Sequence, residues 1–297
     1  MFGCAECLRA LHARIRASVE RVTDDFEVVY VDDRSKDGAW PILRSLAAED
    51  PSVRALRLSR NFGQHAAITA GLERATGDHV VVMDCDLEDP PEEIPRLLAK
   101  AREGYDMVLS RRLHPRQRGF RRLASRLYFR ARRTLMGVDV DPDYCTLSVL
   151  SRDVVRSFLA IRDRHRQYML ILHWLGFRRA VVDVEQGQRG SGRSSYTLRQ
   201  LIRLGVDGFF FETTVLLSWI VYLGFAVALA GAGLALYFVV SYAALGSVPG
   251  FTSLAVLLLL VGGFIIVSTG VTGLYIGKIF EQVKKRPLFV ISESVER

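Results

Sequence analysis

Two aspartates separated by one residue form the sharpest chemical signal in the chain. Asp84 and Asp86 lie in the segment MDCDLEDPPE (83–92), directly after an apolar run that is typical of a strand. On an extended backbone alternate side chains share a face, so both carboxylates can reach one cation. Their hard oxygen atoms suit Mg²⁺ or Mn²⁺, which bridge phosphate oxygens and neutralise a departing diphosphate. The alternative is a pair of turn-capping aspartates, but the Pro90-Pro91 helix start and a second acidic strand end favour the metal site.

That second acidic strand end lies upstream, in VDDRSKDG (31–38). A carboxylate here can accept hydrogen bonds from the base or ribose of a nucleotide, and this role is expected for Asp32 and Asp33. Ser35 and Asp37 are candidates to cap the following helix, and capping alone explains Asp37.

The elements that must position these aspartates alternate between strands and helices. Strands are expected at 26–33, 53–58, 79–84, 105–110, 145–150 and 177–185, and helices at 5–22, from 37, at 63–75, after 90, from 152, and at 166–175 and 197–212. This alternation predicts an α/β fold with a mainly parallel sheet covered by helices on both faces. Ligands bind such sheets at the carboxyl ends of the strands, so both acidic pairs are expected in one crevice.

A block of arginines interrupts this alternation. Between Arg111 and Arg133 there are ten arginines and no acidic residue. With its interleaved leucines and aromatic residues, the region 112–137 is expected to form a helix that lies on a membrane surface, where Arg126 and Arg130 bind a lipid phosphate or a diphosphate. The alternatives are a basic run that binds nucleic acid and an ordinary basic helix exposed to solvent. The membrane spans elsewhere in the chain favour lipid, and no nucleic-acid partner is expected.

A long stretch without charge follows. From Thr213 to Gly277, 65 consecutive positions hold no Asp, Glu, Lys or Arg. Its two candidate spans, about 214–241 and 252–276, each exceed the roughly 20 residues needed to cross a bilayer. Basic residues flank the pair on its outer sides and are missing from the linker, so both termini are expected in the cytoplasm. A juxtamembrane helix is expected at 201–212, and a cytoplasmic tail at 278–297.

The cysteines and histidines carry no recognisable catalytic pattern. Four cysteines are too few for a disulfide framework in a chain of 297 residues, and Cys4-x-x-Cys7 lacks a second pair to complete a zinc site. Reduced thiols are therefore expected. No Ser-His-Asp or Cys-His nucleophile is recognised, and His65, His79 and His165 are expected to be structural. The first thirty residues hold several charges in place of an apolar core, so no cleavable signal peptide is expected.

The order of the motifs along the chain resembles one known family. The chain resembles the polyprenyl-phosphate glycosyltransferases of glycosyltransferase family 2. The resemblance lies in four segments that precede the paired apolar spans: VDDRSKDG (31–38), SRNFGQHAAITAGLERATGD (59–78), MDCDLEDPPE (83–92) and RGSGRSSYTL (189–198). The resemblance covers nearly the whole chain. It implies a GT-A (Rossmann-like) nucleotide-binding fold at 1–200, a nucleotide-sugar donor, Mg²⁺ or Mn²⁺, and an inverting transfer to polyprenyl phosphate.

Matched position by position, the resemblance implies roles for the acidic residues. Asp84 and Asp86 would bind the metal and the donor, and Asp86 would be a catalytic residue. Glu88 stands where the family usually has Gln and would be a further oxygen ligand of the metal. Asp33 would hold the base.

The resemblance also implies a phosphate site in the loop that follows the last strand. Arg189 opens the pattern R-x-x-G-x-S-x-Y, which includes Ser194, and would grip a phosphate of the donor or the acceptor during catalysis. A lipid phosphate is already anionic near pH 7 and needs little help from a general base, which fits the missing nucleophile.

The chain departs from the family at its amino terminus. Members normally begin with a strand and a P-x-Y-N-E-like turn, whereas Phe2-Gly3-Cys4 would occupy the Tyr-Asn-Glu positions here. We therefore expect a sheet that lacks its first strand, with Phe2 at the donor nucleotide. Because a missing central strand leaves backbone groups unpaired, the native chain is expected to start upstream.

Three functions stay open at this point. The first is a multi-pass glycosyltransferase of the inner membrane, in contact with membrane lipids, that moves a sugar from a nucleotide-sugar to polyprenyl phosphate. A UDP-sugar is expected as the donor in preference to a GDP-sugar. Assembly into a homo-oligomer is left open. The second is a processive polysaccharide synthase, which normally has more spans and a Q-x-x-R-W motif that is not found here. The third is a membrane-anchored nucleotide-binding partner without turnover.

Overall fold

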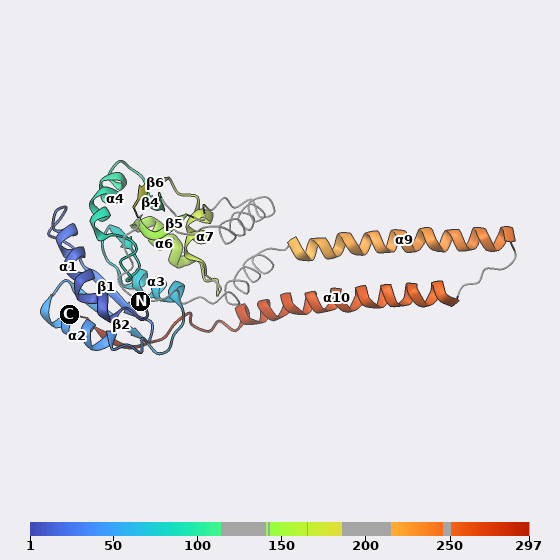
Figure 1. Ribbon diagram of the computed structural model, residues 1–297, viewed down its shortest axis with the longest axis horizontal. Coiled ribbons are helices and arrows are strands. Elements are labelled where there is room, and N and C mark those ends of the chain that lie inside the picture. The colour runs from blue at the N-terminus through green and yellow to red at the C-terminus, as the bar shows by residue number, and fades with distance from the viewer. Residues whose placement is uncertain (114–140, 142, 165, 186–214, 246–250, 297) are drawn as a thin grey trace. The chain divides into compact units, whose positions relative to one another are not determined.

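The computed structural model describes residues 1–113, 141, 143–164, 166–185, 215–245 and 251–296. The chain divides into one unit of Met1–Ser195 with Arg286–Arg297 and another of Tyr196–Lys285. The first unit contains the strands, and the second contains two long helices (Figure 1). Most of the expected surface helix at 112–137 and all of the juxtamembrane helix at 201–212 lie outside the described residues.

Strands and helices alternate in the first unit, as expected. The strands are β1 (Val28–Asp32), β2 (Val53–Leu58), β3 (His79–Val82), β4 (Met107–Arg112), β5 (Tyr144–Ser151), β6 (Arg179–Val184) and β7 (Ile291–Val295). The helices are α1 (Leu8–Val19), α2 (Ala39–Glu49), α3 (Gln64–Arg74), α4 (Ile94–Ala101), α6 (Arg152–Ala160) and α7 (Tyr168–Leu175), and short 3-10 turns are formed by Ala5–Cys7 and Pro91–Glu93. Each strand expected from the sequence is present with its ends within two residues.

The strands form two mixed sheets, with the orders β1-β2-β7 and β3-β5-β4-β6. Strand pairs β1/β2 and β4/β6 are parallel, whereas β5 runs antiparallel to β3 and β4, and β7 runs antiparallel to β2. The expectation of a mainly parallel sheet is therefore wrong. Arg111 near the end of β4 lies opposite Tyr144 at the start of β5, so the chain enters β5 beside the end of β4 and runs back along it. An antiparallel partner of this kind needs no helical crossover.

The amino-terminal residues lie beside β1, at an edge of its sheet. β1 and β3 lie at the ends of their sheets, and among the described residues no strand joins them. The Met1 amine donates a hydrogen bond to the Val31 carbonyl (2.7 Å), and the Asp33 amide donates one to the Met1 carbonyl (2.9 Å). This is the pattern of a parallel bridge, so Met1 pairs with β1.

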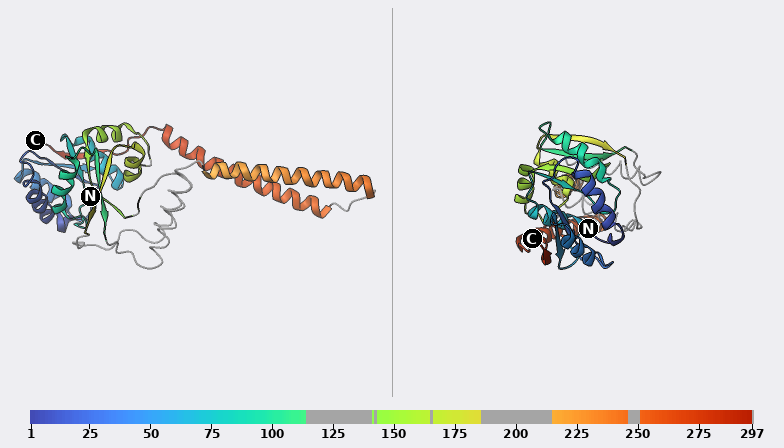
Figure 2. Two further views of the ribbon diagram at one scale, coloured as in Figure 1. Left: turned by 90° about the horizontal axis from the view of Figure 1, so that it is seen from above. Right: turned by 90° about the vertical axis from the view of Figure 1, so that its left-hand side faces the viewer.

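Helices cover both faces of the sheets, which confirms the α/β fold (Figure 2). Met107 and Leu109 of β4 pack with α6 and α7, whereas Val108 between them packs with α4. In the other sheet Tyr30 packs with α1 and α2, and its neighbour Val31 packs with α3. Side chains that alternate between two buried faces explain why these strands are nearly continuous apolar runs.

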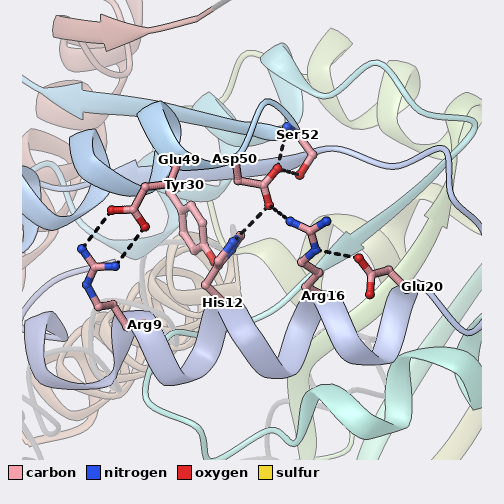
Figure 3. A network of polar contacts seen from close by, with 8 residues as sticks. All are labelled: Arg9, His12, Arg16, Glu20, Tyr30, Glu49, Asp50 and Ser52. Carbon is pink, nitrogen blue, oxygen red and sulfur yellow. Dashed lines mark hydrogen bonds and ion pairs between the residues drawn. The ribbon is translucent and has the colours of Figure 1, made fainter.

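A buried carboxylate fastens α1 to the end of α2 (Figure 3). Asp50 lies 3.2 Å from His12 and 2.9 Å from Arg16, both of which project from α1. The amide and the hydroxyl of Ser52 also donate hydrogen bonds to Asp50, at 2.8 and 2.7 Å. Burial raises the pKa of Asp50, but the Ser52 hydrogen bonds and the Arg16 charge outweigh it and leave the pKa below its usual value.

The second unit contains α9 (Val215–Leu245) and α10 (Phe251–Val283), of 31 and 33 residues. At 1.5 Å per residue each helix is longer than the roughly 30 Å of a bilayer core. By length and composition the segments Leu217–Leu234 and Val261–Val283 can cross a membrane, which agrees with the two expected spans. A Cβ atom at Gly224 of α9 would lie 3.2 Å from the Phe264 ring of α10, so this glycine permits the close approach of the two helices.

The tail that follows α10 contains a strand that we did not expect. β7 pairs with β2, and residues 286–297 therefore belong to the first unit. Glu293 of β7 lies 2.8 Å from Arg57 of β2 and accepts a hydrogen bond from the Trp40 indole at 2.9 Å.

Candidate donor and metal site

Asp33, at the carboxyl end of β1, binds the segment that begins α3. Its carboxylate accepts hydrogen bonds from the backbone amides of Phe62 (2.7 Å) and Gly63 (2.8 Å). Burial raises the pKa of Asp33, and these two hydrogen bonds partly offset that effect. Gly63 has a φ of 95°, a backbone conformation that L side chains rarely adopt, so glycine suits this turn.

Asp32 is fully buried and contacts the chain itself. One carboxylate oxygen accepts a hydrogen bond from the Ser35 amide at 2.9 Å, and the other lies 3.4 Å from Arg57. These contacts fix the turn after β1. Asp37, in the same turn, accepts a hydrogen bond from the amide of Ala39 at the start of α2, but the N-cap residue of this helix is Gly38, so the expectation that Asp37 caps it is wrong.

Asp84 follows β3 and faces the same end of α3. It accepts hydrogen bonds from the Gln64 side chain and the Thr146 hydroxyl, both at 2.8 Å. Burial and the neighbouring Asp86 charge raise the pKa of Asp84, while these hydrogen bonds lower it. Consecutive residues at the start of α3 therefore bind the two acidic strand ends, because the Gly63 amide contacts Asp33 and the Gln64 side chain contacts Asp84.

The acidic loop continues through Asp86 and Glu88. The Glu88 amide donates a hydrogen bond to Asp86 (3.1 Å), and the Glu88 carboxylate lies 3.6 Å from Arg112. Leu87 between them has a φ of 64°, in the left-handed region, so the chain turns sharply here. Within the described ranges, no three His, Cys, Asp or Glu side chains gather as a cation site.

The charges of Asp84 and Asp86 are compatible with a divalent cation, whose binding stays a prediction. The charge of Asp86 raises the pKa of Asp84, which means that the two carboxylates repel each other. A cation bound by both would remove this repulsion, and phosphate oxygens and water would complete its coordination. Glu88 would have to leave Arg112 to join them.

Several residues around this loop were missed from the sequence. Asp89 is buried and accepts a hydrogen bond from the Leu147 amide at 3.2 Å. Burial and the Asp84 charge raise the pKa of Asp89 to about 6 despite the nearby Arg112. Gln64 could have been found, because it opens a helix directly after a strand and so lies at the carboxyl edge of the sheet. Thr146 offered no signal, because only the antiparallel insertion of β5 brings it to Asp84.

A disulfide joins Cys4 to Cys85. The expectation of reduced thiols is therefore wrong for this pair, and Cys7 and Cys145 are buried thiols. The two bonded residues are 81 positions apart, so only the fold reveals that their Cα atoms lie 6.2 Å from each other. Phe2, expected at the donor nucleotide, lies between this disulfide and Met1, and half of its surface is exposed.

The other expected phosphate-binding residues, Arg126, Arg130, Arg189 and Ser194, lie outside the described residues. His65 has a structural contact, because its Nδ1 accepts a hydrogen bond from the Tyr168 amide at 3.3 Å. Burial lowers the pKa of His65, so the ring is neutral near pH 7.

The sequence of the chain is similar to those of known glycosyltransferases. Residues 3–159 match glycosyl transferase family 2. The chain is 36% identical over 293 residues to an undecaprenyl-phosphate 4-deoxy-4-formamido-L-arabinose transferase of Pseudomonas fluorescens, which covers 97% of this chain and 86% of that protein. It is 30% identical over 289 residues to an uncharacterized glycosyltransferase of Bacillus subtilis, with 95% and 88% covered.

Among solved structures, mannosyl-3-phosphoglycerate synthase from Rubrobacter xylanophilus aligns at 17% identity and a TM-score of 0.46, over 75% of this chain and 72% of that one. The family match spans more than half of the chain, and the relatives in Pseudomonas and Bacillus align over nearly all of it. The chain therefore belongs to glycosyl transferase family 2.

Proposed function

We propose that this glycosyltransferase moves a sugar from a nucleotide-sugar, a UDP-sugar in preference to a GDP-sugar, to polyprenyl phosphate with inversion of the anomeric carbon. The observation that carries the proposal is the shared contact of two acidic strand ends with the start of α3, Asp33 through Gly63 and Asp84 through Gln64. This arrangement supports one site that takes both the base and the diphosphate. The Pseudomonas relative is named as an undecaprenyl-phosphate sugar transferase, which supports the lipid acceptor.

Asp84 and Asp86 would hold Mg²⁺ or Mn²⁺, with Glu88 as a third oxygen ligand. The cation would stabilise negative charge on the leaving diphosphate as a Lewis acid. Gln64 and Thr146 orient the Asp84 carboxylate through their hydrogen bonds. Asp33 would accept a hydrogen bond from the base, and Phe2 would lie beside it.

In the reaction an oxygen of the acceptor phosphate forms a bond to the anomeric carbon. The bond from that carbon to the diphosphate breaks on the opposite face, and the nucleoside diphosphate leaves. No proton has to be removed from an anionic acceptor, which agrees with a neutral, internally bonded His65. Arg189 and Ser194 would bind the reacting phosphates, and Arg126 and Arg130 the lipid headgroup.

The same proposal locates the protein in the inner membrane, with α9 and α10 crossing the bilayer and both termini in the cytoplasm. β2 precedes the two long helices and β7 follows them, yet they pair in one sheet. Chain segments that pair in one sheet lie on the same side of a membrane. The pairing therefore supports an even number of crossings, and the flanking basic residues favour the cytoplasmic side.

The test uses membranes that contain the full chain, undecaprenyl phosphate, Mn²⁺ and a panel of labelled UDP- and GDP-sugars. We expect label in the lipid fraction with at least one UDP-sugar, and its loss in Asp86→Ala. Asp153→Ala, which changes an exposed aspartate of α6, should keep full activity.

Each other outcome contradicts part of the proposal. Equal labelling by Asp86→Ala would refute the metal site. A labelled polymer in place of a single lipid-linked sugar would favour the processive synthase. Binding of a nucleotide without transfer from any donor would favour the nucleotide-binding partner.

A further inference from the structure

The disulfide between Cys4 and Cys85 joins two segments that both belong to the candidate site. Cys85 lies between Asp84 and Asp86, in the acidic loop. Cys4 lies in the amino-terminal segment 1–5, which runs beside the turn after β1. The cross-link therefore connects the diphosphate side of the site to the base side.

The amino-terminal segment is held on the turn after β1 by a series of hydrogen bonds. Met1 pairs with β1 next to Asp33. Two residues later the Gly3 amide donates a hydrogen bond to the Ser35 hydroxyl (3.3 Å), and the Ala5 amide donates one to Asp37 (2.8 Å). Any displacement of this segment is therefore transmitted to the turn that carries Asp33.

On the other side, the disulfide reaches the acidic loop from its core-facing side. Cys85 packs with Met83 and Leu87 against the apolar cluster formed by α1 and α2, whereas Asp84 extends to Gln64 and Thr146. Leu87 has a left-handed backbone, which is unfavourable for a residue with a side chain. The cross-link thus restrains a sharply turned loop through the residue that lies between its two aspartates.

We propose that the Cys4–Cys85 disulfide is a positioning cross-link of the donor site, so that donor affinity depends on the redox state of this pair. The inference rests on the proposed function, in which this site binds a nucleoside diphosphate and a divalent cation. When the disulfide is formed, the acidic loop and the turn after β1 are held in their binding geometry. When it is reduced, the ligand has to order both segments as it binds, which weakens binding.

The chemistry is thiol–disulfide exchange with a small-molecule disulfide such as oxidised glutathione. One protein thiolate attacks that disulfide and releases one small thiol; the second protein thiolate then attacks the mixed disulfide and releases the other. The two protein sulfurs lose two electrons, and the small disulfide gains them. Cytosolic reductants keep most thiols reduced. If the site lies in the cytosol, the proposal therefore means that donor binding becomes tighter when conditions turn oxidising and the disulfide forms.

The first test compares one preparation of the full chain in detergent, oxidised with glutathione disulfide, then reduced with dithiothreitol, and then reoxidised. Calorimetry measures the Kd for UDP, and in parallel for GDP, with Mn²⁺ at each stage. We expect the Kd to rise about three- to tenfold on reduction, the range for ordering about one additional side chain on binding, and to return on reoxidation. Peptide mapping without reductant should recover Cys4 and Cys85 in one linked fragment only in the oxidised samples.

Variants separate this pair from general effects of reductant. Cys4→Ser and Cys85→Ser should each show the weaker Kd in both conditions, and the double variant should be no weaker than either. Cys7→Ser, which changes a buried thiol outside the disulfide, should respond to reductant as the wild type does. Equal Kd values for the oxidised and reduced wild type, or tighter binding after reduction, would overturn the proposal.

Hydrogen exchange in the absence of any nucleotide provides a readout that is independent of the proposed function. We expect the backbone amides of residues 2–5 and 84–88 to exchange faster after reduction, while those of β4 are unchanged. Unchanged exchange in both segments would overturn the positioning role, even if a nucleotide binds. If neither UDP nor GDP binds in any state, the proposed donor fails, and the exchange comparison still decides whether the disulfide orders the loop.

Discussion

Asp33→Asn is the most informative single substitution, because Asp33 combines a structural and a proposed functional role. Its carboxylate accepts the backbone amides of both Phe62 and Gly63, and its side chain is almost completely buried. An asparagine has one acceptor oxygen and one amino group at these positions. One of the two amides at the start of α3 would therefore lose its partner.

The size of the effect follows from two opposing contributions. A hydrogen bond to a charged group contributes about 1.5–3 kcal/mol, and its loss here leaves a buried amide unpaired. Burial raises the pKa of Asp33, which means that the ionised carboxylate carries a desolvation penalty that asparagine avoids. We therefore expect a net destabilisation of about 1–2 kcal/mol, or about 2–8 °C in Tm for a domain of this size. Loss of the proposed contact with the base should also weaken UDP binding about tenfold.

Thermal unfolding in detergent and calorimetry with UDP and Mn²⁺ measure the two effects. Asp37→Asn is the matched control, because Asp37 also accepts two backbone amides but is exposed, so that water can replace them. Its Tm should change by no more than about 2 °C. The reasoning is refuted if Asp33→Asn keeps both the wild-type Tm and the wild-type Kd, or if the two variants behave alike.

Two further predictions concern the helices. Asp50→Asn should destabilise the first unit by about 1.5–3 kcal/mol near pH 7. Glu49→Gln, at an exposed ion pair with Arg9, should change stability far less, because water screens this pair. The folded pKa of Asp50 lies below its usual value of 3.8, so the stabilisation by this carboxylate is complete above that pH and is lost as the pH falls through the folded pKa. Urea unfolding should therefore show that the difference in stability between the wild type and Asp50→Asn disappears in acid. Gly224→Leu should drive α9 and α10 apart and lower the Tm measured from the circular-dichroism signal of the helices. Gly231→Leu, with no atom near its added Cβ, should leave that Tm unchanged. Equal effects of the two substitutions would contradict the close packing of α9 and α10.

Much of the fold could be predicted because its signals are local. Strands buried on two faces are apolar runs, and β2 was located to the residue at 53–58. The antiparallel direction of β5 and the pairing of β7 were not predictable, because strand direction depends on where the intervening chain returns. Arg57 and Glu293 are 236 positions apart, and no sequence period relates them.

The candidate site shows the same division. Asp33 and Asp84 could be proposed because each follows an apolar strand, and parallel strands bring their ends to one edge. Their hydrogen-bond partners could not be derived, because Thr146 reaches Asp84 through an antiparallel strand. The bond between Cys4 and Cys85 was missed for a related reason, since composition indicates the compartment but not which thiols meet.

The position of β7 after the long helices determines how this protein can be shortened. A chain cut before α9 to obtain a water-soluble enzyme would also lose β7, and the edge of β2 would be left with unpaired backbone groups. Such an edge pairs readily with other chains, so the product should aggregate during expression. A soluble version needs residues 286–297 rejoined to the chain ahead of α9 through a flexible linker. The hairpin of α9 and α10 is thus an insertion within the first unit, because residues 286–297 of that unit follow the two helices in the sequence.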